Sequence, residues 1–136
     1  MDKSEKGIIV RKDDVFIIPK GEVFQGDVIV LGGVVSVKGT LKGNIVSLRG
    51  KIKVNGYVEG DLVAIYSKVV LAGAVSKVML LYSEMVVDGG DYSDMYVFFS
   101  YGDILRVPKV ANLTVKKGPI SSFLFGILFG YIFSFL

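Results

Sequence analysis

A repeat of about 17 residues, running from Gly26 to Asn112, limits the possible folds more than any other feature of the chain. A fixed period this short indicates a solenoid, in which each repeat forms one turn stacked on the turn before it. Seventeen residues are too few for a pair of helices and suit one turn of a β-solenoid. Polar residues form one column of the repeat, at steps of 17, 17, 16 and 17: Asp27, Asn44, Asp61, Lys77 and Asp94. Three further columns are Gly39, Gly56, Gly73 and Gly89; Val35, Ile52, Val69 and Met85; and Val37, Val54, Leu71, Val87 and Ile104.

The composition agrees with short strands separated by glycine turns. The chain has 136 residues, of which 51% are hydrophobic, with 17 glycines and 3 prolines, and one domain is natural for this length. It contains no cysteine and no histidine, which removes disulfides, thiolate metal sites, the commonest general base and the commonest metal ligand. The net charge of +3 gives no strong indication of nucleic-acid binding. We therefore expect no cofactor, no metal, no nucleic-acid partner and no enzymatic activity.

Residues 44–60 serve as the template for one turn. Strands over 45–48, over 51–54 and around Val58 alternate with corners that contain Gly50, Gly56 and Gly60. Three strands and three corners predict a roughly triangular coil. We expect the corner glycines to have positive φ angles, which glycine adopts without steric cost.

The second strand of the turn shows clearly which side chains face the core. Lys51 and Lys53 alternate with Ile52 and Val54, and a period of two places the apolar pair inside and the lysines outside. In the short third strand, the inward residues form a third wall of the core: Leu41, Val58 and Val75.

The first strand is apolar at nearly every position, so its facing rests on two weaker observations. Ser47 inside the core would be an unpaired polar group, which costs about 1–3 kcal/mol, and residues 112–115 alternate so that Leu113 and Val115 point inward. We therefore expect one set inside: Ile29, Leu31, Val46, Leu48, Val63, Ile65, Met79, Leu81, Tyr96 and Phe98. The other set would form a predicted lateral face: Val28, Val30, Ile45, Leu62, Ala64, Val78, Leu80, Met95 and Val97. In either facing, one outer side of the coil is apolar, which indicates self-association or a surface covered by a terminal segment of the same chain.

Two columns near one corner carry aromatic and hydroxyl side chains. Tyr66, Tyr82 and Phe99 are each followed by a serine, at Ser67, Ser83 and Ser100. We interpret the aromatic column as a stacking ladder that stabilises the coil, rather than as a site for sugars or bases. The segment from Asp88 to Asp94 has the composition of a calcium loop without its spacing, so we expect a solvated corner there.

Charges are distributed unevenly along the repeat. All charged residues from Lys38 to Lys53 are basic, and all charged residues from Glu84 to Asp103 are acidic. In a stacked coil they become either two belts of opposite charge or two ordinary solvated surfaces. The basic belt is Lys38, Lys42, Arg49, Lys51 and Lys53, and the acidic belt is Glu84, Asp88, Asp91, Asp94 and Asp103.

The two ends of the chain differ from the repeat. Residues 1–12 form a polar tail without the features of a secretory signal peptide, residues 13–115 the β-helix domain, whose first turn (13–26) is degenerate, and residues 116–136 a linker and a hydrophobic segment. The uncharged stretch 120–136 predicts a helix of about 25 Å, slightly short of the ~30 Å hydrocarbon core. The flanking cations Lys109, Lys116 and Lys117 favour a cytoplasmic coil. The alternative is a soluble hydrophobic helix that packs on the open end of the coil or on its apolar outer side. Small residues at every fourth position offer a helix-packing stripe: Ser122, Gly126, Gly130 and Ser134.

The repeat resembles that of the bactofilins and related polymer-forming cytoskeletal proteins over about residues 15–110. The resemblance rests on the stretch GDVIVLGGVVSVKGTLKG, together with GDLVAI and VNGYVEG. It implies a right-handed parallel β-helix that assembles end to end into filaments without a nucleotide and serves as a scaffold at the bacterial membrane. Typical members carry a short N-terminal membrane motif, whereas here the hydrophobic segment is C-terminal.

We therefore expect a self-assembling scaffold at the cytoplasmic face of the membrane, whose partners are further copies of the chain and the bilayer. The alternative is a membrane-tethered β-solenoid that does not polymerise and binds another envelope protein. The end turns would supply the polymerisation contacts: Phe16, Ile18, Phe24, Ile104, Leu113 and Val115.

Overall fold

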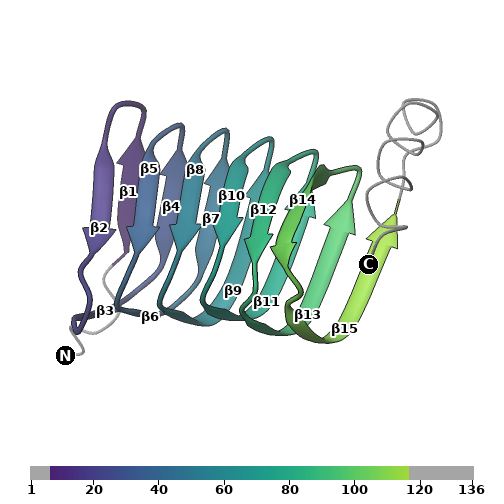
Figure 1. Cartoon of the computed structure of the whole chain (residues 1–136). Coiled ribbons are helices and arrows are strands. Elements are labelled where there is room, and N and C mark those ends of the chain that lie inside the picture. The colour runs from purple at the N-terminus through teal and green to yellow at the C-terminus, as the bar shows by residue number, and fades with distance from the viewer. Residues whose placement is uncertain (1–6, 117–136) are drawn as a thin grey trace.

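The computed structural model describes residues 7–116, and all of its regular elements in this range are β-strands. The strands are wound into a coil whose turns follow one another along a single axis, so β1 and β15 lie at opposite ends (Figure 1). All pairings between named strands are parallel, as the repeat predicts for a β-solenoid.

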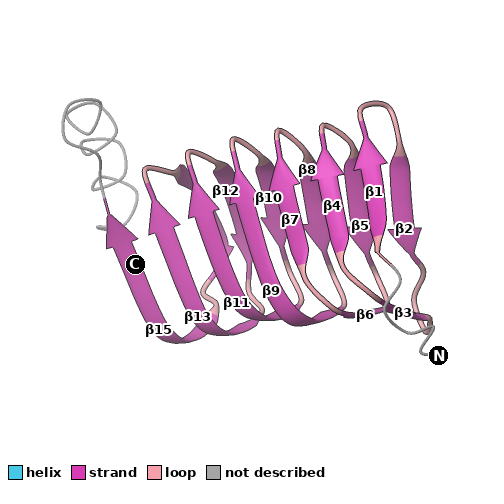
Figure 2. Ribbon diagram, turned by 180° about the vertical axis from the view of Figure 1, so that it is seen from behind, coloured by secondary structure: helices cyan, strands magenta, loops and turns pink. Residues whose placement is uncertain are grey.

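Two sheets line the coil. The six-stranded sheet, called sheet B here, contributes one strand from each of six turns: β2 (Val15–Ile18), β5 (Val34–Val37), β8 (Lys51–Val54), β10 (Lys68–Leu71), β12 (Glu84–Asp88) and β14 (Tyr101–Arg106). The nine-stranded sheet, called sheet A, faces the viewer in Figure 2. Its strands are β1 (Ile8–Arg11), β3 (Val23–Gln25), β4 (Val28–Leu31), β6 (Thr40–Lys42), β7 (Ile45–Leu48), β9 (Tyr57–Ile65), β11 (Ala74–Leu81), β13 (Asp91–Phe98) and β15 (Lys109–Lys116).

The predicted third strand keeps its separate identity only in the early turns. There β3 and β6 are distinct from β4 and β7, but from β9 onward the third strand of one turn and the first strand of the next form one long strand. The corner at Gly60–Asp61 therefore lies inside β9. The coil also begins earlier than position 13, because Ile8–Arg11 pairs with β4.

The register of the repeat is confirmed. Ile52 pairs with Val35 on one side and with Val69 on the other, at the predicted spacing of 17 residues. The single step of 16 is also real, since Lys77 pairs with Asp61 beside an irregularity after Val75. A step of 16 at this point means that one turn is a residue shorter without disturbing the stack.

The core facing of sheet B and of the third wall is confirmed. Ile52 and Val54 are buried while Lys51 and Lys53 are exposed, and Tyr92 continues the third wall as a further buried residue. The inward columns of sheet B, all buried, are Val35, Ile52, Val69 and Met85 together with Val37, Val54, Leu71 and Val87. The buried third wall is Leu41, Val58 and Val75.

The predicted facing of the first strand is wrong. Ser47 is fully buried, but it is not unpaired, because its Oγ lies 2.8 Å from the Oγ of Ser67. The alternation of the last strand also supports the opposite facing, because Leu113 pairs with Met95 and Val115 with Val97. If Leu113 and Val115 point inward, Met95 and Val97 do so as well. The residues predicted outside are buried in the core: Val28, Val30, Ile45, Leu62, Ala64, Val78, Leu80, Met95 and Val97.

The predicted reason for the corner glycines is also wrong at all three corners of the template turn, because none of Gly50, Gly56 and Gly60 has a positive φ angle. Gly39, Gly56 and Gly73 do not have positive φ angles. A Cβ on Gly56 would instead overlap the carbonyl oxygen of Gly39, one turn earlier, and a Cβ on Gly73 would overlap that of Gly56. Glycine is needed here because adjacent turns approach closely. Gly90 contacts Gly73 in the same way, so it occupies this column in place of the predicted Gly89.

Candidate functional site

The N-terminal end of the coil presents strands that pair on one side only. Within residues 7–116, β1, β2 and β3 each have a single strand partner, toward the interior of the coil. Phe16 and Phe24, two of the predicted polymerisation residues, lie at this end and are partly buried. Their ring centroids are 5.2 Å apart in an edge-to-face arrangement. Ile18, also predicted to form the contact, is 2% exposed and belongs to the core.

The C-terminal end has the same character. In the described part of the chain, β14 pairs only with β12 and β15 only with β13. Leu113 and Val115 continue inward columns of the core, yet they are 53% and 38% exposed. Ile104 is partly buried. The core columns thus run open to the end of the coil, where the described chain places no further turn over them.

An apolar outer surface does exist, but it consists of the residues of the first strand that were predicted to lie inside. We call it the apolar face. It lies on the outer side of sheet A, toward the viewer in Figure 2, and its side chains range from partly buried to about two-fifths exposed. The strand registers align them in two columns: Ile29, Val46, Val63, Met79 and Tyr96, and Leu31, Leu48, Ile65, Leu81 and Phe98.

Polar residues border the apolar face. The second column ends at Arg11 on one side and at Lys116 on the other, since these residues pair with Leu31 and Phe98. A polar ladder runs along one edge of the apolar face, at the positions just before Val28, Ile45 and Leu62. It consists of Asp27, Asn44 and Asp61. The Asp27 Oδ1 accepts the backbone N–H of Asn44 at 2.9 Å, and the Asn44 Oδ1 accepts that of Asp61 at 2.8 Å. The repeat marked this column, but sequence reasoning missed these hydrogen bonds.

The aromatic column at the opposite edge forms the predicted stack. The ring centroids of Tyr66 and Tyr82 are 5.2 Å apart and nearly parallel, and those of Tyr82 and Phe99 are 5.1 Å apart. All three residues have φ angles near +50°, in the left-handed region that bulky residues rarely adopt. The corner requires this backbone conformation, which Gly32 and Arg49 adopt in earlier turns. Stacking offsets part of its cost, since an aromatic pair contributes about 0.5–1.5 kcal/mol.

The serines that follow the aromatics form a buried ladder of hydrogen bonds. The backbone N–H of Ser67 donates to the Oγ of Ser83 at 3.0 Å, and that of Ser83 donates to the Oγ of Ser100 at 2.9 Å. The backbone N–H of Gly50 donates to Ser67 Oγ at 3.1 Å. Each hydroxyl also donates to the carbonyl two residues earlier, as Ser67 does to Ile65. These hydroxyls therefore join successive turns of the coil through hydrogen bonds.

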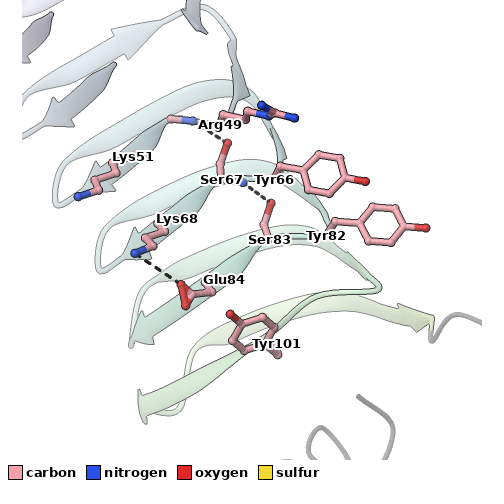
Figure 3. A pocket seen from close by; sticks show the side chains of 10 residues that line it. Arg49, Lys51, Tyr66, Ser67, Lys68, Tyr82, Ser83, Glu84 and Tyr101 are labelled. Atoms are coloured by element: carbon pink, nitrogen blue, oxygen red, sulfur yellow. Dashed lines mark hydrogen bonds and ion pairs between the residues drawn. The ribbon is translucent and has the colours of Figure 1, made fainter. Parts of the chain in front are cut away.

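A shallow groove of about 290 Å³ runs beside this corner (Figure 3). Tyr66 and Tyr82 project from one side, while Lys51, Lys68 and Glu84 lie along the other. Lys68 and Glu84 form an ion pair with an N–O distance of 3.9 Å. Burial, followed by a hydrogen bond with Glu84, raises the pKa of Tyr101 above its ordinary value. The groove thus combines aromatic side chains with basic and acidic ones.

The acidic belt is partly neutralised by its neighbours. Arg106 donates from Nε to Asp88 at 2.6 Å, and Glu84 pairs with Lys68. Asp94 accepts a hydrogen bond from Asn112 at 3.0 Å. Among residues 7–116, no three His, Cys, Asp or Glu side chains are grouped so that they could hold a metal ion. Both cations, Lys68 and Arg106, lie outside the basic belt, so the ion pairs reduce the charge of the acidic belt without joining the two belts.

Tyr92 is a core residue that sequence reasoning missed. It is 1% exposed, and its hydroxyl donates to the carbonyl of Gly89 at 3.1 Å. Burial, and then the charges of Asp88 and Asp91, raise the pKa of Tyr92 well above 10.0. The register contained the signal, because Tyr92 aligns with Val75 and Val58 in the third wall.

The predicted helix over about 119–136, with its stripe Ser122, Gly126, Gly130 and Ser134, lies outside the described residues, as does Lys117. Within residues 7–116, no helix has the length and apolar character needed to cross a bilayer. No family model, no curated protein and no solved structure matches the chain.

Proposed function

We propose that this protein is a self-assembling scaffold whose coils stack end to end into filaments without a nucleotide. The proposal has the coil right-handed and roughly triangular, as the bactofilin resemblance implies. It places the protein at the cytoplasmic face of the membrane, held by a helical C-terminal segment. The observation that carries it is that both ends of the described coil present strands with one unpaired edge, and such edges template pairing with another chain.

The strand registers predict which residues would meet when unlike ends join. Continuing the columns would stack Leu113 of one copy on Ile8 of the next, and Val110 on Phe24. Gly102 would lie opposite Phe16, so the end with no side chain in this column meets the end with a large ring. In this column the two ends are thus complementary in size.

Such a joint connects different surfaces of identical molecules. It is heterologous, so it does not close on itself when successive coils are aligned, and it produces an open filament. The parallel ladder would continue across the joint at the ordinary strand spacing of about 4.8 Å. Ion pairs within the coil already reduce the charge available to attract unlike ends. Apolar contact and backbone pairing should therefore dominate, and filaments should persist at high salt.

The alternative function is a membrane-tethered module that binds another envelope protein and does not polymerise. The apolar face supports this second candidate, because a contiguous apolar surface commonly marks a contact site. It requires that the purified chain remain a monomer.

The test is electron microscopy and sedimentation of the full chain in detergent, with and without ATP or GTP, at low and high salt. We expect filaments under all of these conditions. Leu113→Arg and Phe24→Arg should each give a folded monomer, because the new charge would be buried unpaired in the joint. Leu105→Arg is the matched control, since Leu105 lies at the same end of the coil as Leu113 and is 66% exposed. Monomers of the unmodified chain at high concentration would favour the tethered module, and filaments of both end variants would rule out the end-to-end contact.

A further inference from the structure

The apolar face of sheet A is an exposed surface that end-to-end assembly leaves unused. In its central part, from Ile29 to Phe98, the two outward columns hold aliphatic and aromatic side chains at every position. Leu48 is 43% exposed and Ile29 is 42% exposed, and within residues 7–116 no other element packs on them. A solvent-facing sheet normally alternates apolar residues inside with polar residues outside. This sheet is apolar on both sides.

The size of the face argues against a second copy as its stable occupant. Five turns at about 4.8 Å, and four residues at about 3.3 Å along each strand, give roughly 300 Å². A stable protein interface buries about 800 Å² on each partner. A single coil therefore offers less than half of the surface that a lasting pair would need.

The borders of the face favour a bilayer. Arg11 and Lys116 end its second column, and Arg49 occupies the corner beside Leu48. Tyr66 and Tyr82 project from the same corner, where they are 56% and 47% exposed. Tyrosine and basic side chains next to an apolar surface suit the lipid headgroup region, because each has an apolar body and a polar end.

The position of the chain's hydrophobic segment favours the same occupant. β15 ends at Lys116, which pairs with Phe98 of the face. The uncharged stretch from Ile120 to Leu136 therefore follows this sheet after a short connection. A segment anchored in the membrane would hold the outer side of sheet A near the lipid.

We propose that the apolar face of sheet A lies on a lipid bilayer, with the edge formed by Tyr66 and Tyr82 more deeply placed than the opposite edge. Asp27 and Asp61 lie along that opposite edge, and Asp27 is exposed. Carboxylates are repelled by apolar lipid, so the coil is tilted toward its aromatic edge. This proposal rests on the membrane location in the proposed function and is independent of end-to-end assembly.

The chain contains no tryptophan, so a single introduced tryptophan reports on its own surroundings. Leu48→Trp and Ile65→Trp place the probe on the face, and Lys53→Trp places a control on the exposed outer side of sheet B. Each full-length variant is reconstituted with vesicles of phosphatidylcholine brominated on its acyl chains, after circular dichroism has confirmed its β-structure. Bromine quenches tryptophan only at close range. We expect a blue shift and a loss of emission for both face variants and neither for Lys53→Trp.

Each of the other outcomes overturns the proposal and identifies a different occupant. A blue shift without vesicles that does not depend on protein concentration means that the chain's own C-terminal segment covers the face. A blue shift without vesicles that grows with concentration means that a second copy covers it. Variants that float with the vesicles without being quenched retain the membrane anchor but turn the face away from lipid. Variants that do not float refute both the anchor and the lipid contact.

Discussion

Replacing Gly56 by alanine should strongly destabilise the coil, although the position does not have a positive φ angle. A Cβ there would overlap two backbone oxygens of the previous turn, those of Gly39 and Lys38, and no side chain can move to relieve the overlap. The N–H of Gly56 donates to the carbonyl of Val37 and the N–H of Tyr57 to that of Gly39, both at 2.9 Å. Making room must stretch or break these two hydrogen bonds.

The magnitude follows from two opposing effects. A buried backbone group that loses its partner costs about 1–3 kcal/mol, and two such groups are at risk. Alanine at a permitted φ angle stabilises by about 0.4–1 kcal/mol, because it restricts the unfolded chain. The steric effect is larger, so we expect Gly56→Ala to lower the free energy of unfolding by about 2–4 kcal/mol.

Gly21→Ala is the matched control, because the φ angle of Gly21 and the space around its Cβ position are both opposite to those of Gly56. Gly21 has a φ angle of +87°, and a Cβ there would meet nothing within 4 Å. The cost should be only the left-handed backbone strain, about 1 kcal/mol. Urea unfolding of the full chain in detergent, followed by circular dichroism, gives both values. The close-approach argument fails if Gly56→Ala is neutral or stabilising, or if Gly21→Ala costs more.

Three further predictions concern single side chains. The fold disfavours the ionised form of Tyr92, whose pKa in the unfolded chain is 10.0. As the pH rises above this value, Tyr92 should lower the free energy of unfolding by about 1.4 kcal/mol per pH unit. Tyr92→Phe should flatten this loss in urea titrations from pH 9 upward, and an unchanged slope would contradict the assignment. Ser67→Ala should lower the free energy of unfolding by about 1–3 kcal/mol, since it leaves the Gly50 N–H and the Ser47 hydroxyl without a partner. Ser76→Ala, on the exposed surface, should change it by less than about 0.5 kcal/mol. Equal effects of the two substitutions would show that the serine ladder is unimportant. At Tyr82, whose φ angle is +51°, glycine should be tolerated better than alanine by about 1 kcal/mol in thermal unfolding, and the usual reverse order would mean that the corner relaxes.

The turn spacing and the facing of sheet B were predictable because Lys51 and Lys53 alternate with Ile52 and Val54. The facing of the first strand was not, since its residues are apolar on both sides. The one polar residue that seemed to decide it, Ser47, is paired with Ser67 from the next turn, and a single turn of sequence cannot reveal that contact. The reason for the glycines at 39, 56 and 73 was missed for a related cause, because it lies in the distance between turns. The predicted end residues Phe16, Phe24 and Leu113 do lie at the ends of the described coil, whereas Ile18 is covered.

The stacking of the coil also determines how it can fold. Paired strands are separated by only 16 to 20 residues along the chain, at every level of the stack. The loop that must close to add a turn is therefore equally short near either end, so its entropic cost does not grow as the coil lengthens. Folding should be limited by the formation of the first two adjacent turns, after which each further turn is added to a ready edge. A nascent coil would thus expose a growing edge until its last turn is added, and a sequence change that slows the addition of a turn would prolong the time for which that edge is open to another chain.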